Sequence, residues 1–352
     1  MKKKIAMLLT AAMVLGLVGC GQAAAPAAEA APAAQTEEAA PAAEEAPAAE
    51  EAAPAAEAAQ TYTVGVCQLV EHVALDAATQ GFEDALKEAL GDAVTFDEQN
   101  AQGDSNTCST IINSFVSNNV DLILANATPA LQAAAAGTNE IPILGTSVTE
   151  YGVALDIDNF SGTVGGNISG TSDLAPLDGQ ADIFTELLPN VKKVALLYCS
   201  AEANSQYQVD KVAEFLSAKG IETEYFAFAD SNDLSAVCTS ATTSCEAIYV
   251  PTDNTVASNT EIIQNICGPA NIPVVCGEEG ICKGCGIATL SISYYDLGVA
   301  TGKMAAKILT GEANISEMPV EYAPQFVKKY NVANCEALGI EIPSDYVAIE
   351  AE

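Results

Sequence analysis

Short apolar runs alternate with helical patterns along most of the chain, and this alternation is the strongest constraint on its fold. Strands alternating with helices predict parallel βαβ units, so the sequence predicts an α/β protein. The pattern restarts after a glycine-rich passage near residue 165, which predicts two doubly wound parallel-sheet lobes. The predicted strands are 62–70, 94–97, 121–125, 141–144, 153–155, 193–198, 222–227, 247–250, 274–275 and 287–293. The predicted helices are 72–90, 105–118, 129–137, 205–219, 233–239, 254–266 and 295–309.

The first twenty residues have the parts of an export signal. Three lysines precede an apolar run that is short for a membrane span and ends in Leu17-Val18-Gly19-Cys20. This ending resembles the lipobox of bacterial lipoproteins. We therefore expect residues 1–20 to be a lipoprotein signal peptide and Cys20 to be the lipidated first residue of the mature protein. An ordinary signal peptide, or an uncleaved anchor with Cys20 incidental, is the alternative.

Residues 21–60 are almost entirely Ala, Pro and Glu. Recurrent prolines favour extended backbone and the glutamates repel one another, so the segment predicts a disordered tether with a reach of about 100 Å. Partial helix between the prolines is the alternative. In either case the fold begins near residue 61.

The net charge is −34, and the basic residues are all lysine. An acidic surface argues against nucleic acid as a partner and against direct adsorption to anionic lipid. Without arginine, an anionic ligand has to be bound by hydroxyls, backbone amides or lysine. His72 is the one histidine, which leaves little material for a His-rich metal site or for acid/base catalysis. We expect no enzyme activity, no cofactor and no metal.

Ten cysteines follow Cys20. Cys67 and Cys199 lie in apolar runs and are predicted to be buried free thiols. Cys282 and Cys285 form a Cys-x-x-Cys motif, which in other proteins is a redox dithiol or half a metal site. No second such motif accompanies it, so two structural cysteines in a loop are the preferred interpretation. Whether any of the cysteines pair stays open.

Polar segments follow the predicted strands in both halves of the chain. Ligands of doubly wound sheets bind beyond the carboxyl ends of strands, so two lobes predict a site in the cleft between them. These segments are 71–72, 126–129 and 145–149 in the first half, and 200–205, 251–254 and 277–280 in the second.

These segments, together with 68–72, 170–173 and 292–298, resemble the tryptophan/tyrosine-type substrate-binding lipoproteins of ABC importers, over residues 61–345. The resemblance implies a type I periplasmic-binding-protein fold with three hinge crossings, near 172–177, 289–294 and 318–322. Lobe 1 would comprise 61–173 and 292–318, and lobe 2 would comprise 174–291 and 319–352. It also implies an aromatic or other apolar L-amino acid as ligand.

An amino acid carries a carboxylate and an ammonium, and burial of either without partners costs several kcal/mol. For the carboxylate we expect hydroxyls and helix N-termini at Thr128, Thr146 and Ser147. For the ammonium we expect Asp253 from the opposite lobe. The supporting candidates are Asn204, Glu202, Asn254 and, as a reserve ammonium partner, Glu278. Capping of helix N-termini is the alternative role for the hydroxyls and for Asp253.

Two further residues are candidates for ligand contact. His72 lies at the first strand-to-helix turn, where it either touches ligand or has a structural role. Tyr151 either stacks on an aromatic ligand or fills the lobe interface.

The expected function is capture of an L-amino acid and its delivery to an ABC permease. We expect a monomer, held by its lipid anchor at the outer face of the bacterial cell membrane. Three alternatives stay open: a surface adhesin or sensor lipoprotein on the same fold, a receptor for a sugar, nucleoside or autoinducer, and a cysteine-dependent redox enzyme.

Overall fold

The structure, a computed structural model, describes residues 60–350. The predicted signal peptide, Cys20 and the tether up to residue 59 lie outside the described residues. Within 60–350, no helix is both long and apolar enough to cross a bilayer.

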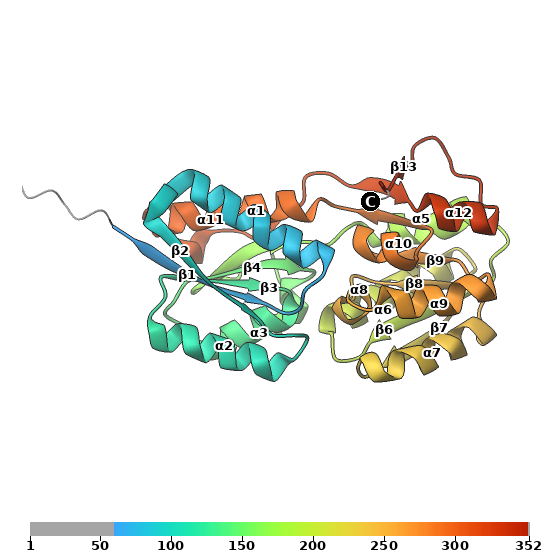
Figure 1. The fold of residues 1–352 in the computed structure, drawn as a ribbon, viewed down its shortest axis with the longest axis horizontal. Helices are drawn as coiled ribbons and strands as arrows, with labels where there is room; N and C mark the ends of the chain where they lie inside the picture. The colour runs from blue at the N-terminus through green and yellow to red at the C-terminus, as the bar shows by residue number, and fades with distance from the viewer. Residues whose placement is uncertain (1–59, 351–352) are drawn as a thin grey trace, which may run out of the picture. The chain divides into compact units, whose positions relative to one another are not determined.

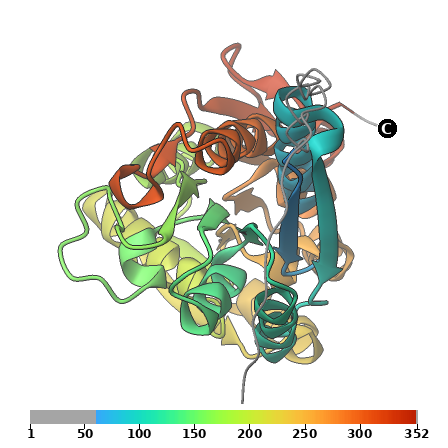
Figure 2. The same ribbon diagram turned by 90° about the vertical axis from the view of Figure 1, so that its left-hand side faces the viewer.

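The first sheet has six strands in the order β11-β5-β4-β3-β1-β2, and every neighbouring pair is parallel. Helices α1 and α11 cover one face, and α2 and α3 cover the other (Figures 1 and 2). The strands are β1 (Tyr62–Gln68), β2 (Val94–Asn100), β3 (Leu122–Asn126), β4 (Ile143–Val148), β5 (Ile168–Ser172) and β11 (Glu321–Tyr322). The helices are α1 (Val73–Leu90), α2 (Ser105–Asn118), α3 (Thr128–Gly137), α4 (Tyr151–Ala154) and α11 (Tyr294–Leu309), with 3-10 turns η1 (Gly91–Ala93) and η2 (Ile315–Glu317).

The second sheet has seven strands in the order β13-β12-β10-β9-β8-β6-β7, and only β12 and β13 run against the others. The strands are β6 (Lys193–Cys199), β7 (Glu222–Phe228), β8 (Ala247–Val250), β9 (Val274–Cys276), β10 (Ala288–Ser291), β12 (Val327–Tyr330) and β13 (Val347–Ala348). The helices are α5 (Leu177–Leu187), α6 (Ala203–Ala218), α7 (Ser231–Ser244), α8 (Asn254–Ala257), α9 (Thr260–Ala270), α10 (Glu279–Cys285) and α12 (Val332–Leu338).

Each sheet lies between two apolar cores, so its central strands are continuous apolar runs rather than alternating ones. In β3 every residue is buried, and the same holds for β8. The predicted α/β architecture with two doubly wound parallel-sheet lobes is therefore confirmed. Cys67 in β1 and Cys199 in β6 are buried, as predicted.

The structure differs from the sequence predictions at several local points. The predicted strand at 153–155 is instead the short helix α4, because the Glu150 carboxylate accepts a hydrogen bond from the Val153 amide and caps a helical turn. The predicted helix at 254–266 is divided into α8 and α9, since Asn259 leaves the helical conformation at φ −137° and ψ 29°. Strand β5 was not predicted because it contains Gly170 (φ 145°) and lacks a run of large apolar residues.

The chain crosses between the sheets three times: after β5, after β10 and after β11. The third crossing falls later than predicted, because Glu321 and Tyr322 pair in parallel with Thr171 and Ser172 of the first sheet. The boundary expected at residue 319 would have placed them in the second lobe. The last crossing therefore lies between β11 and β12.

Helices α1 and α11 pack at very short distance through glycines. A Cβ atom on Gly298 would overlap the carbonyl oxygen of Ala78, and one on Gly81 would overlap the carbonyl oxygen of Tyr295. Backbone lies against backbone at both points, so neither position has a flexible side chain that can yield. This contact fixes α11, which begins at the second crossing, onto the first lobe.

We expect Gly298→Ala to lower the free energy of unfolding by about 1–3 kcal/mol, the usual cost of overpacking a tight contact. Urea denaturation measures the change. Gly268→Ala in α9 is the matched control, because a Cβ there meets only ordinary van der Waals contact. The control is expected to be neutral or slightly stabilising. Equal effects of the two substitutions would contradict this account of the α1–α11 contact.

Candidate ligand-binding site

A cavity lies between the two lobes, where strands of both sheets end. Its walls are the residues that directly follow strands, together with the first residues of the next helices. The lining residues are His72, Leu75, Ser147, Asp173, Asn204, Thr252, Asp253, Asn254, Ala257, Glu278 and Tyr294.

The lobes touch each other at this cavity. His72 Nε2 lies 3.2 Å from Asn254 Oδ1, and the hydroxyls of Thr149 and Thr252 are 3.3 Å apart. The cavity has a volume of about 10 Å³, which is room for roughly one water molecule. A larger ligand therefore enters only when the lobes separate or the lining side chains move.

Asp173 lines the cavity with a carboxylate oxygen that has no hydrogen-bond partner. It follows β5 directly and is 4 % exposed. Its Oδ2 accepts a hydrogen bond of 2.9 Å from the Tyr294 hydroxyl, whereas its Oδ1 is buried without a hydrogen-bond partner. Burial raises the pKa of the Asp173 carboxyl. A cationic partner would satisfy Oδ1 and offset that burial.

Ser147 and Asn204 also present buried oxygens without partners. The Ser147 hydroxyl comes from the first lobe and the Asn204 Oδ1 from the second. Ser147 has φ 54°, a left-handed conformation that is unfavourable for serine, in a bulge at the end of β4. Strained residues of this kind cluster at binding sites.

Asp253 lines the cavity, but both of its oxygens already have partners. Oδ1 accepts from the Val256 amide at 2.9 Å and caps α8, while Oδ2 accepts from the Cys199 amide at 2.7 Å. Burial, and next the charge of Glu202, raise the pKa of Asp253 to about 8. The predicted role as ammonium partner stays a prediction, and the geometry gives Asp253 a structural role as a cap.

Glu278 caps α10 by accepting from the amides of Gly280 and Ile281. Burial raises its pKa to about 7, against these two backbone hydrogen bonds, which lower it. Glu278 lies on the same cavity as Asp173, and the charge of Asp173 adds to the upward shift. Close to neutral pH this carboxyl therefore changes its charge readily.

His72 precedes α1 without capping it, and its ring bonds to Asn254 of the second lobe. Burial lowers the pKa of the imidazole, so the ring is neutral at pH 7. The structure thus gives His72 a position on the cavity and a contact between lobes.

The remaining predicted residues do not line this cavity. Thr128 begins α3, and the Thr146 hydroxyl bonds to those of Thr171 and Thr301 inside the first lobe. Tyr151 is 1 % exposed; its hydroxyl donates to the Thr171 carbonyl and its ring stacks on Phe160 rather than facing a ligand.

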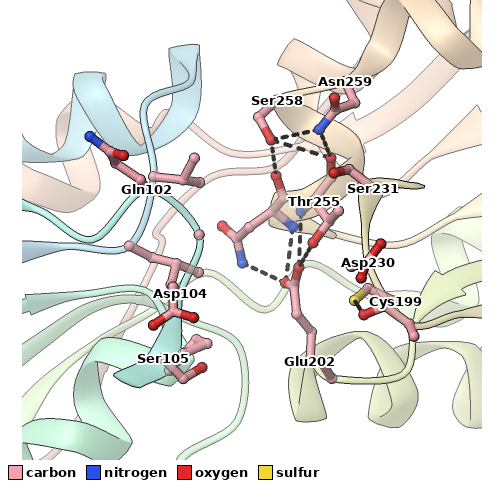
Figure 3. Close-up of a pocket in the computed structure, with 17 residues that line it drawn as sticks. Gln102, Asp104, Ser105, Cys199, Glu202, Asp230, Ser231, Thr255, Ser258 and Asn259 are labelled. Atoms are coloured by element: carbon pink, nitrogen blue, oxygen red, sulfur yellow. Dashed lines mark hydrogen bonds between the residues drawn. The ribbon is translucent and has the colours of Figure 1, made fainter. Parts of the chain in front are cut away.

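Glu202 borders a second, larger pocket of about 290 Å³ at the edge of the cleft. Figure 3 shows Gln102, Asp104 and Ser105 of the first lobe facing Glu202 and Asp230 across it. The Glu202 carboxylate accepts hydrogen bonds from the backbone amides of Asn254 and Thr255 and from their side chains (Figure 3). Glu202 thereby holds the start of α8, and Asn254 connects this pocket to the cavity because it lines both.

Asp173 was not among the predicted ligand residues. The sequence pattern predicts no strand at β5, and so it predicts no strand end in front of Asp173. The signal was present, since Asp173 ends a Gly-Thr-Ser-Asp segment that belongs to the family resemblance.

The cysteines form no site on this cavity. Cys282 and Cys285 lie on α10, not in a loop as predicted, and face the apolar core behind β9. All ten cysteines between residues 60 and 350 are free and buried. In that part of the chain no group of three or more His, Cys, Asp or Glu side chains could hold a metal ion.

Two parallel α/β lobes that enclose a polar cavity at their strand ends define a two-lobed ligand-binding protein. The sequence model of the family described as ABC transporter substrate binding protein matches residues 63–352, so the chain belongs to that family. It is therefore similar to proteins that bind small molecules and work with ABC permeases.

Individual members of this family are similar to the chain in sequence and in structure. The chain is 35 % identical to a tyrosine-binding protein of Clostridioides difficile (strain R20291), over 73 % of this chain and 75 % of the relative. It is 32 % identical to the crystal structure of an ABC domain in complex with L-Trp from Streptococcus pneumonia, with a TM-score of 0.77, covering 81 % of this chain and 97 % of that one. The ligand-free, open structure of CD0873 from Clostridium difficile, a substrate-binding protein with adhesive properties, is 36 % identical with a TM-score of 0.64, covering 83 % and 100 %.

The raised pKa of Glu278 predicts a pH dependence of stability. Between about pH 5 and pH 7 the folded protein keeps a proton that the unfolded chain has released, so the free energy of unfolding falls as pH rises. Glu278→Gln is expected to remove on the order of 2–3 kcal/mol of this fall. Urea denaturation of the ligand-free protein at several pH values measures it. Glu140→Gln, at an exposed loop position, is the control and should keep the wild-type slope; an unchanged slope in Glu278→Gln would refute the assignment.

Proposed function

We propose that this protein is an extracytoplasmic receptor that binds an aromatic L-amino acid in the interlobe cavity and delivers it to an ABC permease. One observation carries the proposal. A buried carboxylate oxygen of Asp173 and a buried hydroxyl of Ser147 line the same cavity, and neither has a partner. An acceptor for an ammonium and a donor for a carboxylate are the two groups that a free amino acid requires.

The ammonium would bind to Asp173 Oδ1. The Tyr294 hydroxyl donates to the other oxygen, Oδ2, and so fixes the orientation of the carboxylate before ligand binds. Binding would then cost little side-chain entropy at Asp173. Glu278, on the same cavity, would add negative charge at the same end of the ligand. This assignment replaces Asp253 as first choice, because both Asp253 oxygens accept backbone hydrogen bonds.

The carboxylate of the ligand would bind to the Ser147 hydroxyl, because the chain contains no arginine that could bind it. The amide nitrogen of Asn204 already donates to the Thr252 carbonyl at 2.9 Å, which orients this side chain. The ligand's ring would lie against Leu75, His72 and Ala257, the less polar part of the wall. Contacts from both lobes make ligand binding favour closure.

The comparisons support the aromatic ligand and the hinge motion. A tyrosine-binding relative and a structure in complex with L-Trp are both more than 30 % identical to this chain. The TM-score is higher to the L-Trp complex than to the open, ligand-free CD0873 structure, although the identity to CD0873 is higher. The difference agrees with the direct contacts between lobes and with the small cavity, both of which are expected of a closed arrangement.

Anchoring follows from the first sixty residues. A lipid on Cys20, in the lipobox-like Leu17-Val18-Gly19-Cys20, would fix the receptor to the outer face of the cell membrane. The Ala/Pro/Glu segment would then be a long tether. Metabolic labelling with a radioactive or clickable fatty acid tests this. Loss of label in Cys20→Ala is the expected result, and label that persists would refute the anchor.

Adhesion is a second candidate function, because CD0873 is described as a substrate-binding protein with adhesive properties. Binding of the purified protein to host-cell surfaces, with and without saturating L-tyrosine, separates the two functions. Adhesion that persists in a variant unable to bind amino acid would show that adhesion is a separate function of the protein.

A thermal-shift screen of the protein, refolded to remove bound ligand, tests the amino-acid proposal. L-tyrosine, L-tryptophan or L-phenylalanine is expected to raise the melting temperature, since a ligand of the folded state stabilises it. The other amino acids, several sugars and several nucleosides are the comparison set. A shift with a sugar or nucleoside alone would keep the fold and overturn the ligand.

Asp173→Asn is expected to weaken binding of the active amino acid at least about 100-fold, because it removes a buried charge opposite the ammonium. Isothermal titration calorimetry measures the loss. Asp178→Asn is the matched control, at an exposed position in the first turn of α5 that lies outside the cavity. Equal affinities of the two variants would refute the role of Asp173.

Affinity is also expected to rise between about pH 5.5 and pH 8. Glu278, with a pKa of about 7, and Asp173, with its raised pKa, must lose protons to pair with an ammonium, so binding releases protons. Titrations in buffers with different ionisation enthalpies measure the release. Affinity that falls over this range would contradict the carboxylate–ammonium pairing.

A further inference from the structure

Another pocket, distinct from the interlobe cavity and from the pocket that Glu202 borders, lies on the first lobe between α1 and the edge strand β2. It has a volume of about 320 Å³ and ten lining residues. Four of them are carboxylates, and none is a cation. These are Glu71, Asp76, Glu83 and Glu98. None of the four lines the interlobe cavity, so the pocket is separate from the amino-acid site.

Glu83 is the buried member of this group, with 7 % of its surface exposed. Its Oε2 accepts from Lys87 at 2.7 Å, but its Oε1 is buried and has no hydrogen-bond partner. Glu98 approaches Glu83 from β2, and the contact with Glu83 is the largest cause of the raised pKa of Glu98. Lys87 pairs with Glu83, and its charge partly opposes the rise in the pKa of Glu98, but two carboxyl groups in contact still favour a proton or a further cation between them.

The neutral lining residues also offer acceptors. The Gln80 amide nitrogen donates to Asp84 at 2.8 Å, and the Gln99 amide nitrogen donates to Asp97 at 2.7 Å. Both side chains line the pocket, and an amide whose nitrogen donates still has its oxygen as an acceptor. The Gln68 amide nitrogen donates to Asp76 Oδ1 at 2.7 Å and orients that carboxylate. A pocket rich in carboxylate and amide oxygens favours a ligand that carries several N–H donors.

The spacing of the carboxylates indicates the length of that ligand. Asp76 and Glu83 are seven residues apart on α1, hence two turns or about 10 Å along one helix face. Two ammonium groups joined by roughly four methylene groups span the distance between such side chains. The methylene stretch would lie over Thr79, between the two carboxylates.

We propose that this pocket binds a short aliphatic diamine, with one ammonium between Glu83 and Glu98 and the other at Asp76 and Glu71. A metal ion is the less suitable occupant, because no group of acidic side chains between residues 60 and 350 has the arrangement to ligate one. Lys87 offsets one of the four negative charges, so a dication leaves the pocket close to neutral.

Calorimetric titration of the full chain with 1,4-diaminobutane at low ionic strength tests the proposal. One saturable site is expected, with affinity that falls as salt is added. Glu83→Gln and Glu98→Gln are each expected to weaken it about tenfold or more. Glu88→Gln, an exposed position on the same helix outside the pocket, is the control and should bind as the wild type does. Butylamine, with one ammonium, should bind more weakly than the diamine.

Several results would overturn the proposal. They are absence of diamine binding, equal binding by Glu83→Gln, tighter binding of Ca²⁺ or Mg²⁺ than of the diamine, and loss of diamine binding in Asp173→Asn, which would place the diamine in the interlobe cavity. A rise in melting temperature of Glu83→Gln without diamine binding to the wild type would mean that the carboxyls share only a proton, and this also overturns it. Circular dichroism and L-tyrosine titration of the same variants show whether they are folded, independently of the diamine.

Discussion

Burial of carboxylates at the strand ends is the constraint on which the rest of this structure depends. Asp173, Asp253 and Glu278 are all buried at one cavity between the lobes. An ionised carboxyl in such a place is costly unless hydrogen bonds or opposite charge satisfy it. Asp253 and Glu278 are satisfied by backbone amides: Glu278 by two at the start of α10, and Asp253 by one at the start of α8 and by that of Cys199 at the end of β6. At the helix starts the helix dipole also favours negative charge. Asp173 is satisfied only on one side.

The unsatisfied side of Asp173 explains how a hinge can be coupled to a ligand. In the closed lobes the carboxylate has lost water without gaining a full set of partners. In the proposed function, an ammonium between the lobes would supply the missing partner and would favour closure by as much as it binds the closed form better. The absence of arginine has the complementary effect, because the carboxylate of such a ligand would then have to be bound by hydroxyls, backbone amides or lysine, and the Ser147 hydroxyl is the proposed donor. In this proposal, few groups would specify the polar end of the ligand.

The architecture followed from the sequence because continuous apolar runs separated by helical segments admit few folds. Where prediction was wrong, local contacts outweighed composition. Glu150 caps a helical turn at α4 that an apolar run suggested as a strand, and β5 forms around Gly170 because backbone there lies against Gly145. The third crossing falls later than predicted for another reason: a two-residue strand such as β11 leaves no pattern in a sequence.

The site was predictable as a region and less so as a set of residues. Six of the predicted residues line the cavity, because residues that follow parallel strands converge at one edge of a sheet. These six are His72, Ser147, Asn204, Asp253, Asn254 and Glu278. Thr146 and Tyr151 turn inward to partners in the first lobe. Sequence cannot distinguish a hydroxyl that caps or bonds internally from one left free, since the difference lies in side-chain direction and in neighbours that are distant along the chain.

A crystal structure of the complex with L-tyrosine tests the central claim most directly. The account predicts the ligand between the lobes, with its ammonium at hydrogen-bond distance, about 2.7–3.2 Å, from Asp173 Oδ1 and its carboxylate on the Ser147 hydroxyl. A ligand bound in the cavity through Asp253, with Asp173 still unpartnered, would contradict it. So would a ligand bound outside the interlobe cavity.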